Sequence, residues 1–318
     1  FEGVGKSKED LLYAIQKDIR LINTESLEEI KLLEKIANEK NKKINVGLRL
    51  NPNIDGDTIN KISTGKKTDK FGIEIDDIDN IINLIKNCSS LNLIGISCHI
   101  GSQISKISAY KNTFIEMKKA ADKFVDAGIK IKHIDLGGGF HVKYSEKDPN
   151  FRIEDVKKEL DFCFDGSDYE LSFEPGRFLI AEAGILITTI INIKQNGGIN
   201  YLIVDAGMNT LIRPAMYNSY HKIESINNKS KIQVSYAVAG PICESSDIFL
   251  KNIELPKQTI GDILVIRDVG AYGKVMSSNY NTRLLPSEVL VNKDLFGIIY
   301  SPNKIEKNIE EDIIPNWL

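Results

Sequence analysis

Three short segments in the first half of the chain combine glycine with side chains that can bind an anion or move a proton. They are HIGSQ, which begins at His99, LGGGF, which begins at Leu136, and EPGR, which begins at Glu174. Successive glycine amides can form a nest for phosphate oxygens, and the Ser102 hydroxyl is expected at the same level of the site, because it also follows a strand. Because each segment follows an apolar run, the three indicate a site at the ends of successive strands.

Each of these segments also has a simpler explanation. A run of three glycines is more often a tight turn than a phosphate site, and a loop serine such as Ser102 usually caps its own backbone. His99 ends an apolar run and could be a buried histidine without a catalytic role. Glu174 is harder to explain, because a buried carboxylate is costly unless it is paired, and Arg177 follows in the same motif.

Further reactive side chains lie in the second half of the chain. In ICESSD the thiol of Cys243 adjoins the carboxylate of Glu244, and the pKa of a cysteine can be tuned for proton donation. In RPAMY, Arg213 could bind a substrate carboxylate through two parallel hydrogen bonds, and Tyr217 ends the same motif. GAYG presents the phenol of Tyr272 between two glycines. A half-buried cysteine and a surface ion pair remain the alternatives for Cys243 and Arg213.

The first three segments belong to a repeating pattern of apolar strand, loop and amphipathic helix. The pattern predicts strands suited to a parallel sheet buried on both faces, at 21–24, 44–50, 93–100, 131–136 and 169–173. Between them, Ser26 and Glu29 match a capping box, and Gly128 suits the end of a helix. We expect residues 1–182 to form a (β/α) barrel without its first strands, an α/β fold, with an open doubly wound sheet as the alternative.

The pattern changes after residue 183, where strand-like runs follow one another with little helix between them. These runs cover 185–193, 201–204, 232–238, 263–266 and 289–299. They predict a β-rich second domain over residues 183–318. The acidic tail over 303–318 is expected to form one short helix.

The composition narrows the class of partner. The net charge of -3 over 318 residues gives no reason to expect nucleic acid, which leaves a small molecule as the substrate. The four cysteines form neither a CxxC pair nor a zinc spacing, so we expect no metal and a reducing, cytoplasmic location. The apolar runs are too short to cross a bilayer, and no export signal is present, so no membrane is expected.

The order HIGSQ, LGGGF, EPGR, RPAMY, ICESSD, GAYG and SSNYN resembles one known family. It is the diaminopimelate decarboxylase family, within the barrel-fold decarboxylases that use pyridoxal 5'-phosphate (PLP). The resemblance runs from Lys6 to Asn281. It implies a (β/α)8 PLP-binding barrel followed by a β-rich domain, and the conversion of meso-2,6-diaminopimelate to L-lysine and CO2 in lysine biosynthesis.

The resemblance also implies a role for each matching residue. His99 would stack on the pyridine ring, and Glu174 would face the ring nitrogen and keep it protonated, which makes the ring a strong electron sink. Cys243 would return a proton to the α-carbon. The phosphate would be held by Ser102, Gly139, Gly176 and Arg177. The substrate would be bound by Arg177, Arg213, Tyr217, Glu244 and Tyr272, the last of which would also touch the cofactor.

Two further expectations follow from the resemblance. The family is a homodimer with a shared active site, in which the partner subunit supplies the loop with Cys243 and Glu244. The family's Schiff-base lysine lies in a tyrosine–alanine–x–lysine context at the end of the first barrel strand, and no such segment occurs here. Lys6 is expected at the third strand and is not a substitute. We expect the missing lysine and the first strands to lie upstream of Phe1.

Two rival functions stay open. The first is decarboxylation of ornithine, arginine or a carboxylated polyamine. Arg213 with Tyr217 favours a substrate with a distal carboxylate, and the CES sequence favours diaminopimelate by resemblance. The second is a non-catalytic regulator on the same scaffold, which need not keep the downstream site residues that this chain retains.

Overall fold

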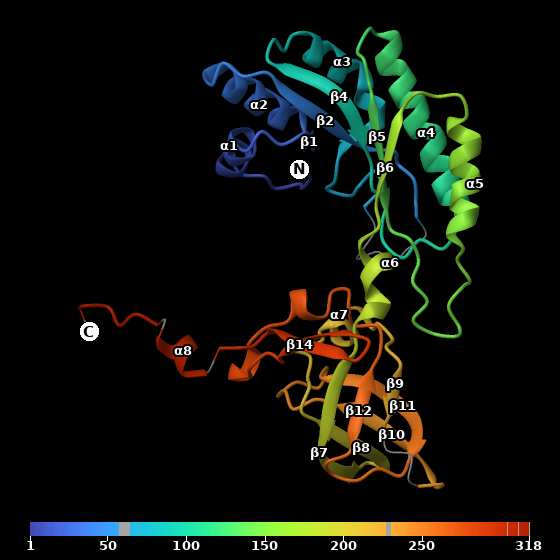
Figure 1. The fold of residues 1–318 in the computed structure, drawn as a ribbon, viewed down its shortest axis with the longest axis vertical. Helices are drawn as coiled ribbons and strands as arrows, with labels where there is room; N and C mark the ends of the chain where they lie inside the picture. The colour runs from blue at the N-terminus through green and yellow to red at the C-terminus, as the bar shows by residue number, and fades with distance from the viewer. Residues whose placement is uncertain (57–63, 227–229, 304, 311, 318) are drawn as a thin grey trace. The chain divides into compact units, whose positions relative to one another are not determined.

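The computed structural model describes residues 1–56, 64–226, 230–303, 305–310 and 312–317, and it divides into two compact units (Figure 1). The first unit consists of Phe1–Lys143 and Pro149–Phe178, and the second of Tyr144–Asp148 and Leu179–Leu318. The sequence predicted a domain boundary after residue 182, and the structure divides the chain between Phe178 and Leu179.

The first unit is built on a parallel sheet in the order β1-β2-β4-β5-β6, with β3 paired to β2. The predicted strands are confirmed, and β3 is an additional two-residue strand that sequence analysis missed. Most inward positions of β1, β2 and β4 are buried apolar residues, which explains why their sequences gave a clear signal. The strands are β1 (Ile22–Thr24), β2 (Ile44–Asn51), β3 (Ile73–Glu74), β4 (Leu91–Ser97), β5 (His133–Gly138) and β6 (Glu170–Glu174).

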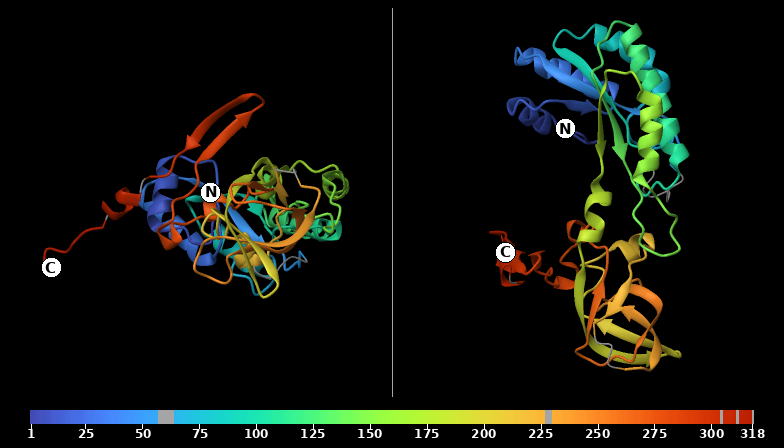
Figure 2. Two further views of the ribbon diagram at one scale, coloured as in Figure 1. Left: turned by 90° about the horizontal axis from the view of Figure 1, so that it is seen from below. Right: turned by 45° about the vertical axis from the view of Figure 1, so that its right-hand side comes forward.

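Helices alternate with these strands, and α4 and α5 lie side by side along the sheet in Figures 1 and 2. The Ser26 hydroxyl caps α2 by accepting a hydrogen bond from the Glu29 amide at 3.1 Å. Gly128, at φ +83°, follows the end of α4 as predicted. The helices are α1 (Lys8–Gln16), α2 (Leu27–Glu39), α3 (Ile78–Lys86), α4 (Ile107–Asp126), α5 (Ile153–Phe164) and α6 (Gly176–Ile180).

The second unit is β-rich, with a mixed sheet in the order β11-β10-β8-β7-β12-β9. Its core contains Ile190, Leu202, Val238 and Leu264. The pairs of neighbouring strands are antiparallel except for β8 with β10, which is parallel. The strands are β7 (Leu186–Asn196), β8 (Ile199–Val204), β9 (Ile223–Ser225), β10 (Gln233–Ala239), β11 (Ile248–Pro256) and β12 (Ile263–Ile266).

The end of the second unit differs from the sequence prediction. The run 289–299 was predicted as one strand, but it forms the hairpin of β13 (Glu288–Asn292) and β14 (Leu295–Tyr300), which projects from the unit in Figure 2. The chain reverses at Lys293, whose φ of +56° lies in the left-handed region. The short helices are α7 (Arg213–Tyr217) and α8 (Ile305–Glu310), and α8 confirms the helix expected in the tail.

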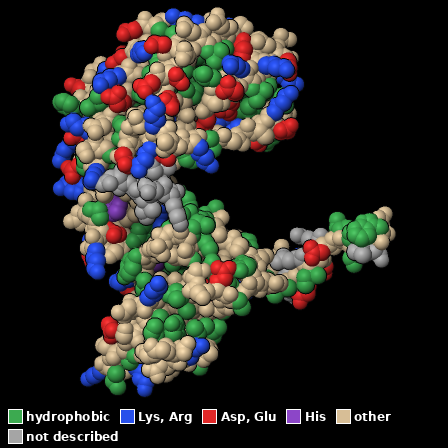
Figure 3. Space-filling model, turned by 180° about the vertical axis from the view of Figure 1, so that it is seen from behind, with side chains coloured by type: hydrophobic (Ala, Val, Ile, Leu, Met, Phe, Trp, Pro, Cys, Tyr) green, Lys and Arg blue, Asp and Glu red, His purple; other side chains and the backbone are tan. Residues whose placement is uncertain are grey.

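On the face shown in Figure 3, acidic and basic side chains are intermixed over the first unit, in keeping with the small net charge. Within the described parts of the chain, no helix is both long and apolar enough to cross a membrane.

Candidate active site

A cavity of about 110 Å³ lies at the carboxyl ends of the strands in the first unit. Arg49 reaches it from β2, Ser97, Cys98 and His99 from the end of β4, and Glu174 from the end of β6. Glu2 completes the lining. Two residues singled out from the sequence, His99 and Glu174, therefore meet in one cavity.

The three glycines of LGGGF pack against both neighbouring loops. A Cβ on Gly138 would lie 2.1 Å from the carbonyl oxygen of Glu174, and a Cβ on Gly139 would lie 2.1 Å from that of Gly101. Gly137 and Gly139 have φ values of +69° and +78°, which other residues rarely adopt. Close approach between loops thus requires glycine at these positions.

Of the two interpretations of the glycine run, the structure favours the tight turn over a nest in which all three amides face an anion. The Gly137 amide donates to Asp135 Oδ1 at 2.8 Å, and the Gly138 amide donates to His99 Nδ1 at 3.2 Å. These two amides therefore serve the protein itself, by fixing the Asp135 carboxylate and the His99 ring. Gly139, the one glycine of the three expected at the phosphate, lies beside the HIGSQ loop, where its carbonyl accepts from the Ile104 amide at 2.8 Å.

His99 is held as a neutral imidazole. Its Nδ1 accepts the hydrogen bond from Gly138, so this nitrogen carries no proton. Burial and then the nearby positive charge of Arg49 lower the pKa of His99 to about 4, although Asp135 acts in the opposite direction. At neutral pH the cavity therefore presents an uncharged aromatic ring, which can lie against another ring without a charge penalty.

Glu174 is an acid that is easily protonated. Partial burial of its carboxyl group, followed by the charges of Asp135 and Glu2, raises its pKa to about 7, while Arg49 opposes the rise. Glu174 lines the cavity and remains exposed. A cation placed beside Glu174 would relieve this crowding of negative charge, because an opposite charge favours the ionised carboxylate.

The raised pKa of Glu174 predicts how the stability of the cofactor-free protein depends on pH. Its ordinary pKa is 4.5, so between about pH 4.5 and 7 the folded protein keeps a proton that the unfolded chain has released. The free energy of unfolding should therefore fall as the pH rises through this window. Urea unfolding at pH 5 and pH 7 measures the change, and Glu174→Gln, which cannot titrate, should show a smaller loss. Equal pH dependence in both proteins would contradict the assignment.

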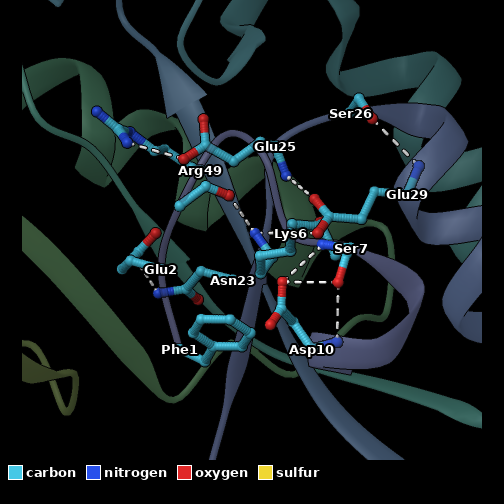
Figure 4. Close-up of polar contacts among 12 residues, drawn as sticks. Phe1, Glu2, Lys6, Ser7, Asp10, Asn23, Glu25, Ser26, Glu29 and Arg49 are labelled. Carbon is cyan, nitrogen blue, oxygen red and sulfur yellow. Dashed lines mark hydrogen bonds and ion pairs between the residues drawn. The ribbon is translucent and has the colours of Figure 1, made fainter. Parts of the chain in front are cut away.

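Arg49 was not singled out from the sequence, although an arginine in the apolar strand VGLRLN must be paired when it is buried. Its Nη1 lies 2.8 Å from Glu25 Oε1, and the two side chains are 12% and 3% exposed. Glu25 also accepts the Gly72 amide at 2.9 Å, and the guanidinium lies 4.9 Å from the ring centre of Phe71. Figure 4 shows this pair beside Glu2. The contacts hold one positive charge at the cavity.

Lys6 lies near the same network but takes a structural part in it. It is in the loop before α1, which corrects the expectation that it lies at a strand. Its Nζ is 3.0 Å from Glu29 Oε1 and donates to the Gly3 carbonyl at 2.5 Å (Figure 4). Glu29 in turn accepts the Glu25 amide at 2.7 Å, in place of the Ser26 amide that a capping box would use. The ammonium group of Lys6 is thus occupied by a buried ion pair.

Ser102 and Arg177 come together as expected for residues that act at one site. Both Nε and Nη2 of Arg177 lie 3.2 Å from Ser102 Oγ. Gly176 opens α6 next to Arg177, and a Cβ built on it would meet no atom within 4 Å. A hydroxyl, a guanidinium and an open backbone position suit an anion such as a phosphate.

In the second unit, a loop after β10 presents Cys243 and Glu244. Cys243 is exposed, and Glu244 accepts hydrogen bonds from the Tyr280 hydroxyl at 2.5 Å and the Ser246 hydroxyl at 3.1 Å. Buried Asp247 shapes the loop, because its carboxylate accepts the amides of Ile242 at 2.7 Å and Met208 at 2.6 Å. Sequence analysis missed Asp247 and Tyr280, although both belong to the motifs quoted above.

Tyr272 is held in an unusual backbone conformation. Its φ of +59° lies in the left-handed region, and its side chain is 43% exposed. Such strain costs free energy and is concentrated at functional sites. Arg213 and Tyr217 lie at the two ends of α7, where Arg213 is buried and Tyr217 is half-buried.

The comparison with known proteins decides the family. Residues 1–181 match the family model described as pyridoxal-dependent decarboxylase, pyridoxal binding domain. Over 295 residues the chain is 39% identical to the diaminopimelate decarboxylase of Pseudomonas fluorescens, which covers 92% of this chain and 70% of that protein. The chain belongs to the diaminopimelate decarboxylase family.

Solved structures from this family are similar along almost the whole chain. The diaminopimelate decarboxylase of Helicobacter pylori, complexed with L-lysine, has a TM-score of 0.92 at 35% identity, covering 97% of this chain and 77% of that one. The diaminopimelate decarboxylase of M. jannaschii has a TM-score of 0.93 at 34% identity, covering 100% of this chain and 75% of that one. These similarities confirm the predicted class, a barrel-type PLP domain followed by a β-rich domain.

Proposed function

We propose that the protein catalyses the PLP-dependent decarboxylation of meso-2,6-diaminopimelate, which yields L-lysine and CO2. The observation that carries the proposal is the cavity in which the neutral His99 ring meets the proton-accepting Glu174 at the ends of parallel strands. Membership of the diaminopimelate decarboxylase family supports the substrate.

The residues of the first unit fit PLP in their chemistry, although Ser102, Gly139, Gly176 and Arg177 do not line the cavity that holds His99 and Glu174. Glu2 and Glu174 place two carboxyl groups with raised pKa values in one cavity, and the buried Oε2 of Glu2 has no hydrogen-bond partner within the described residues. That environment favours a protonated ring nitrogen. Ser102 and Arg177 offer the donors that a phosphate group needs, with Gly139 and Gly176 as close backbone neighbours.

PLP supplies an electron sink that takes up the electron pair left when the bond to CO2 breaks. Glu174 would keep a proton on the ring nitrogen, because its carboxylate is stabilised when that nitrogen is positive. The uncharged His99 would lie against the ring face and exclude water from it. Arg49 stays outside this exchange of protons, since Glu25 already pairs with its charge.

Residues of the second unit bind the substrate and finish the reaction. By the family resemblance, Arg213 and Tyr217 would bind the carboxylate that is retained, and Glu244 would bind the distal amine. The same resemblance assigns Tyr272 to both the substrate and the cofactor. Cys243 holds a proton on Sγ and delivers it to the α-carbon that CO2 has left, which completes the conversion to lysine.

We further propose that the enzyme is a cytoplasmic homodimer, in which the loop with Cys243 and Glu244 serves the active site of the partner copy. The exposure of Cys243 supports this assignment, because a proton donor shared between copies must reach the surface of its own chain.

The decisive experiment compares substrates with the purified holoenzyme. Release of CO2 is measured from meso-2,6-diaminopimelate, ornithine and arginine, each with and without added PLP. We expect PLP-dependent release from diaminopimelate, with lysine formed in equal amount. Faster release from ornithine or arginine would overturn the substrate, and no release from any of the three would favour a non-catalytic regulator.

A further inference from the structure

A buried histidine holds Arg213 in the second unit. Arg213 is 5% exposed and His221 is 2% exposed, so neither side chain exchanges freely with water. Arg213 Nη1 lies 2.8 Å from His221 Nε2, and His221 Nδ1 lies 2.9 Å from the carbonyl oxygen of Arg267. The guanidinium carbon also lies 4.8 Å from the ring centre of Tyr144.

The hydrogen-bonding partners of His221 determine its protonation state. A guanidinium group can only donate a hydrogen bond, and a backbone carbonyl oxygen can only accept one. Nδ1 must therefore carry the proton that it donates to Arg267, and Nε2 must offer its lone pair to Arg213. The imidazole is neutral and held in one tautomer.

A neutral acceptor leaves the charge of the Arg213 guanidinium group uncompensated at this contact, whereas an acidic acceptor would not. A buried carboxylate next to Arg213 would cancel the guanidinium charge and compete with any incoming carboxylate. His221 fixes the direction of the long arginine side chain but adds no negative charge. The ring of Tyr144, 5.3 Å from that of His221, packs against the same group and further restricts it.

We propose that His221 is a positioning residue that aims Arg213 at the substrate carboxylate without adding a negative charge beside the guanidinium group. The proposal rests on the substrate-binding role of Arg213 given above. The contacts with His221 order the Arg213 side chain before the substrate arrives. Without them, the side chain would have to be ordered when the substrate binds, so the KM for diaminopimelate should change more than kcat.

Three substitutions at residue 221 separate positioning from packing. His221→Gln retains both an acceptor and a donor, His221→Phe retains an aromatic ring of similar size without an acceptor, and His221→Glu retains an acceptor but adds a negative charge. Tyr220→Phe, at an exposed neighbouring position, is the matched control. Each protein is assayed as the holoenzyme for kcat, KM and the absorbance of bound PLP.

For His221→Phe and His221→Glu we expect KM to rise by about 10- to 100-fold, the usual effect of a lost charge-assisted contact. His221→Gln should stay within about threefold of the wild type, and PLP absorbance should be unchanged throughout. A wild-type KM in His221→Glu would overturn the requirement for a neutral acceptor, and this test remains should His221→Phe fail to fold.

A parallel variant distinguishes this inference from the proposed function. Arg213→Gln should itself raise KM. If Arg213→Gln leaves KM unchanged, the substrate-binding role of Arg213 is wrong, whatever residue 221 does. If Arg213→Gln raises KM while His221→Phe and His221→Glu do not, only the positioning role of His221 is overturned.

Discussion

Replacing Glu174 with glutamine is expected to lower kcat by about 10²- to 10³-fold, the range found when one preorganised electrostatic contact is removed from an active site. Glutamine has nearly the same shape and can still form a hydrogen bond, but it cannot hold a negative charge beside the ring nitrogen. The burial and the neighbouring carboxylates that raise the pKa of Glu174 to about 7 show that this group responds strongly to charge. Steady-state decarboxylation of meso-2,6-diaminopimelate measures the effect.

The control for this variant is Glu170→Gln, which changes an exposed carboxylate at the start of the same strand, β6. Its kcat should match that of the wild type. Binding of PLP should survive in Glu174→Gln, because the proposed phosphate contacts are made by other residues, Ser102 and Arg177 among them. A kcat within about threefold of the wild type would mean that Glu174 does not face the ring nitrogen.

Replacing Cys243 with alanine is expected to slow product formation by about 10²- to 10⁴-fold, the usual contribution of a positioned general acid. The thiol is exposed on its loop, and Asp247 fixes the backbone next to it, so the substitution removes the proton donor and leaves the loop in place. Lysine formation from diaminopimelate is followed by chromatography.

Cys163→Ala is the matched control for this cysteine, because Cys163 lies on α5, where it packs against the core of the first unit. Its rate should be unchanged. In Cys243→Ala, the absorbance of bound PLP should also be unchanged. Loss of that absorbance would show that Cys243 supports cofactor binding instead of donating the proton.

The sequence was most informative where one physical requirement dominates. Strands β1, β2, β4 and β5 of the first unit are mostly buried, so their apolar runs stood out. Close approach between loops demands glycine at Gly138 and Gly139. Strand β11 was missed, because the exposed Lys251, Asn252 and Glu254 interrupt its apolar residues. The β13–β14 hairpin was predicted as a single strand, because both of its strands are rich in apolar residues, which are exposed in the hairpin. The turn at Lys293 has no glycine to mark it.

The site residues also include some that the sequence identified and some that it did not. The motifs identified the chemical groups, but the charges that alter their pKa values come from segments distant in the sequence. Arg49, on β2, pairs with Glu25, which follows β1, and this pair places a charge at the cavity. His221 is held neutral in part by the carbonyl oxygen of Arg267, which follows β12. An arginine in an apolar strand indicates that some partner is needed, but a single sequence does not show which residue that partner is.

The most direct test of this account is the protonation of the cofactor's ring nitrogen. PLP labelled with ¹⁵N at that position would be bound to wild-type and Glu174→Gln holoenzymes and observed by NMR at pH 8. We predict a protonated nitrogen in the wild type and an unprotonated one in the variant. The same resonance position in both proteins would contradict the placement of PLP with its nitrogen at Glu174, and with it the cavity as the cofactor site.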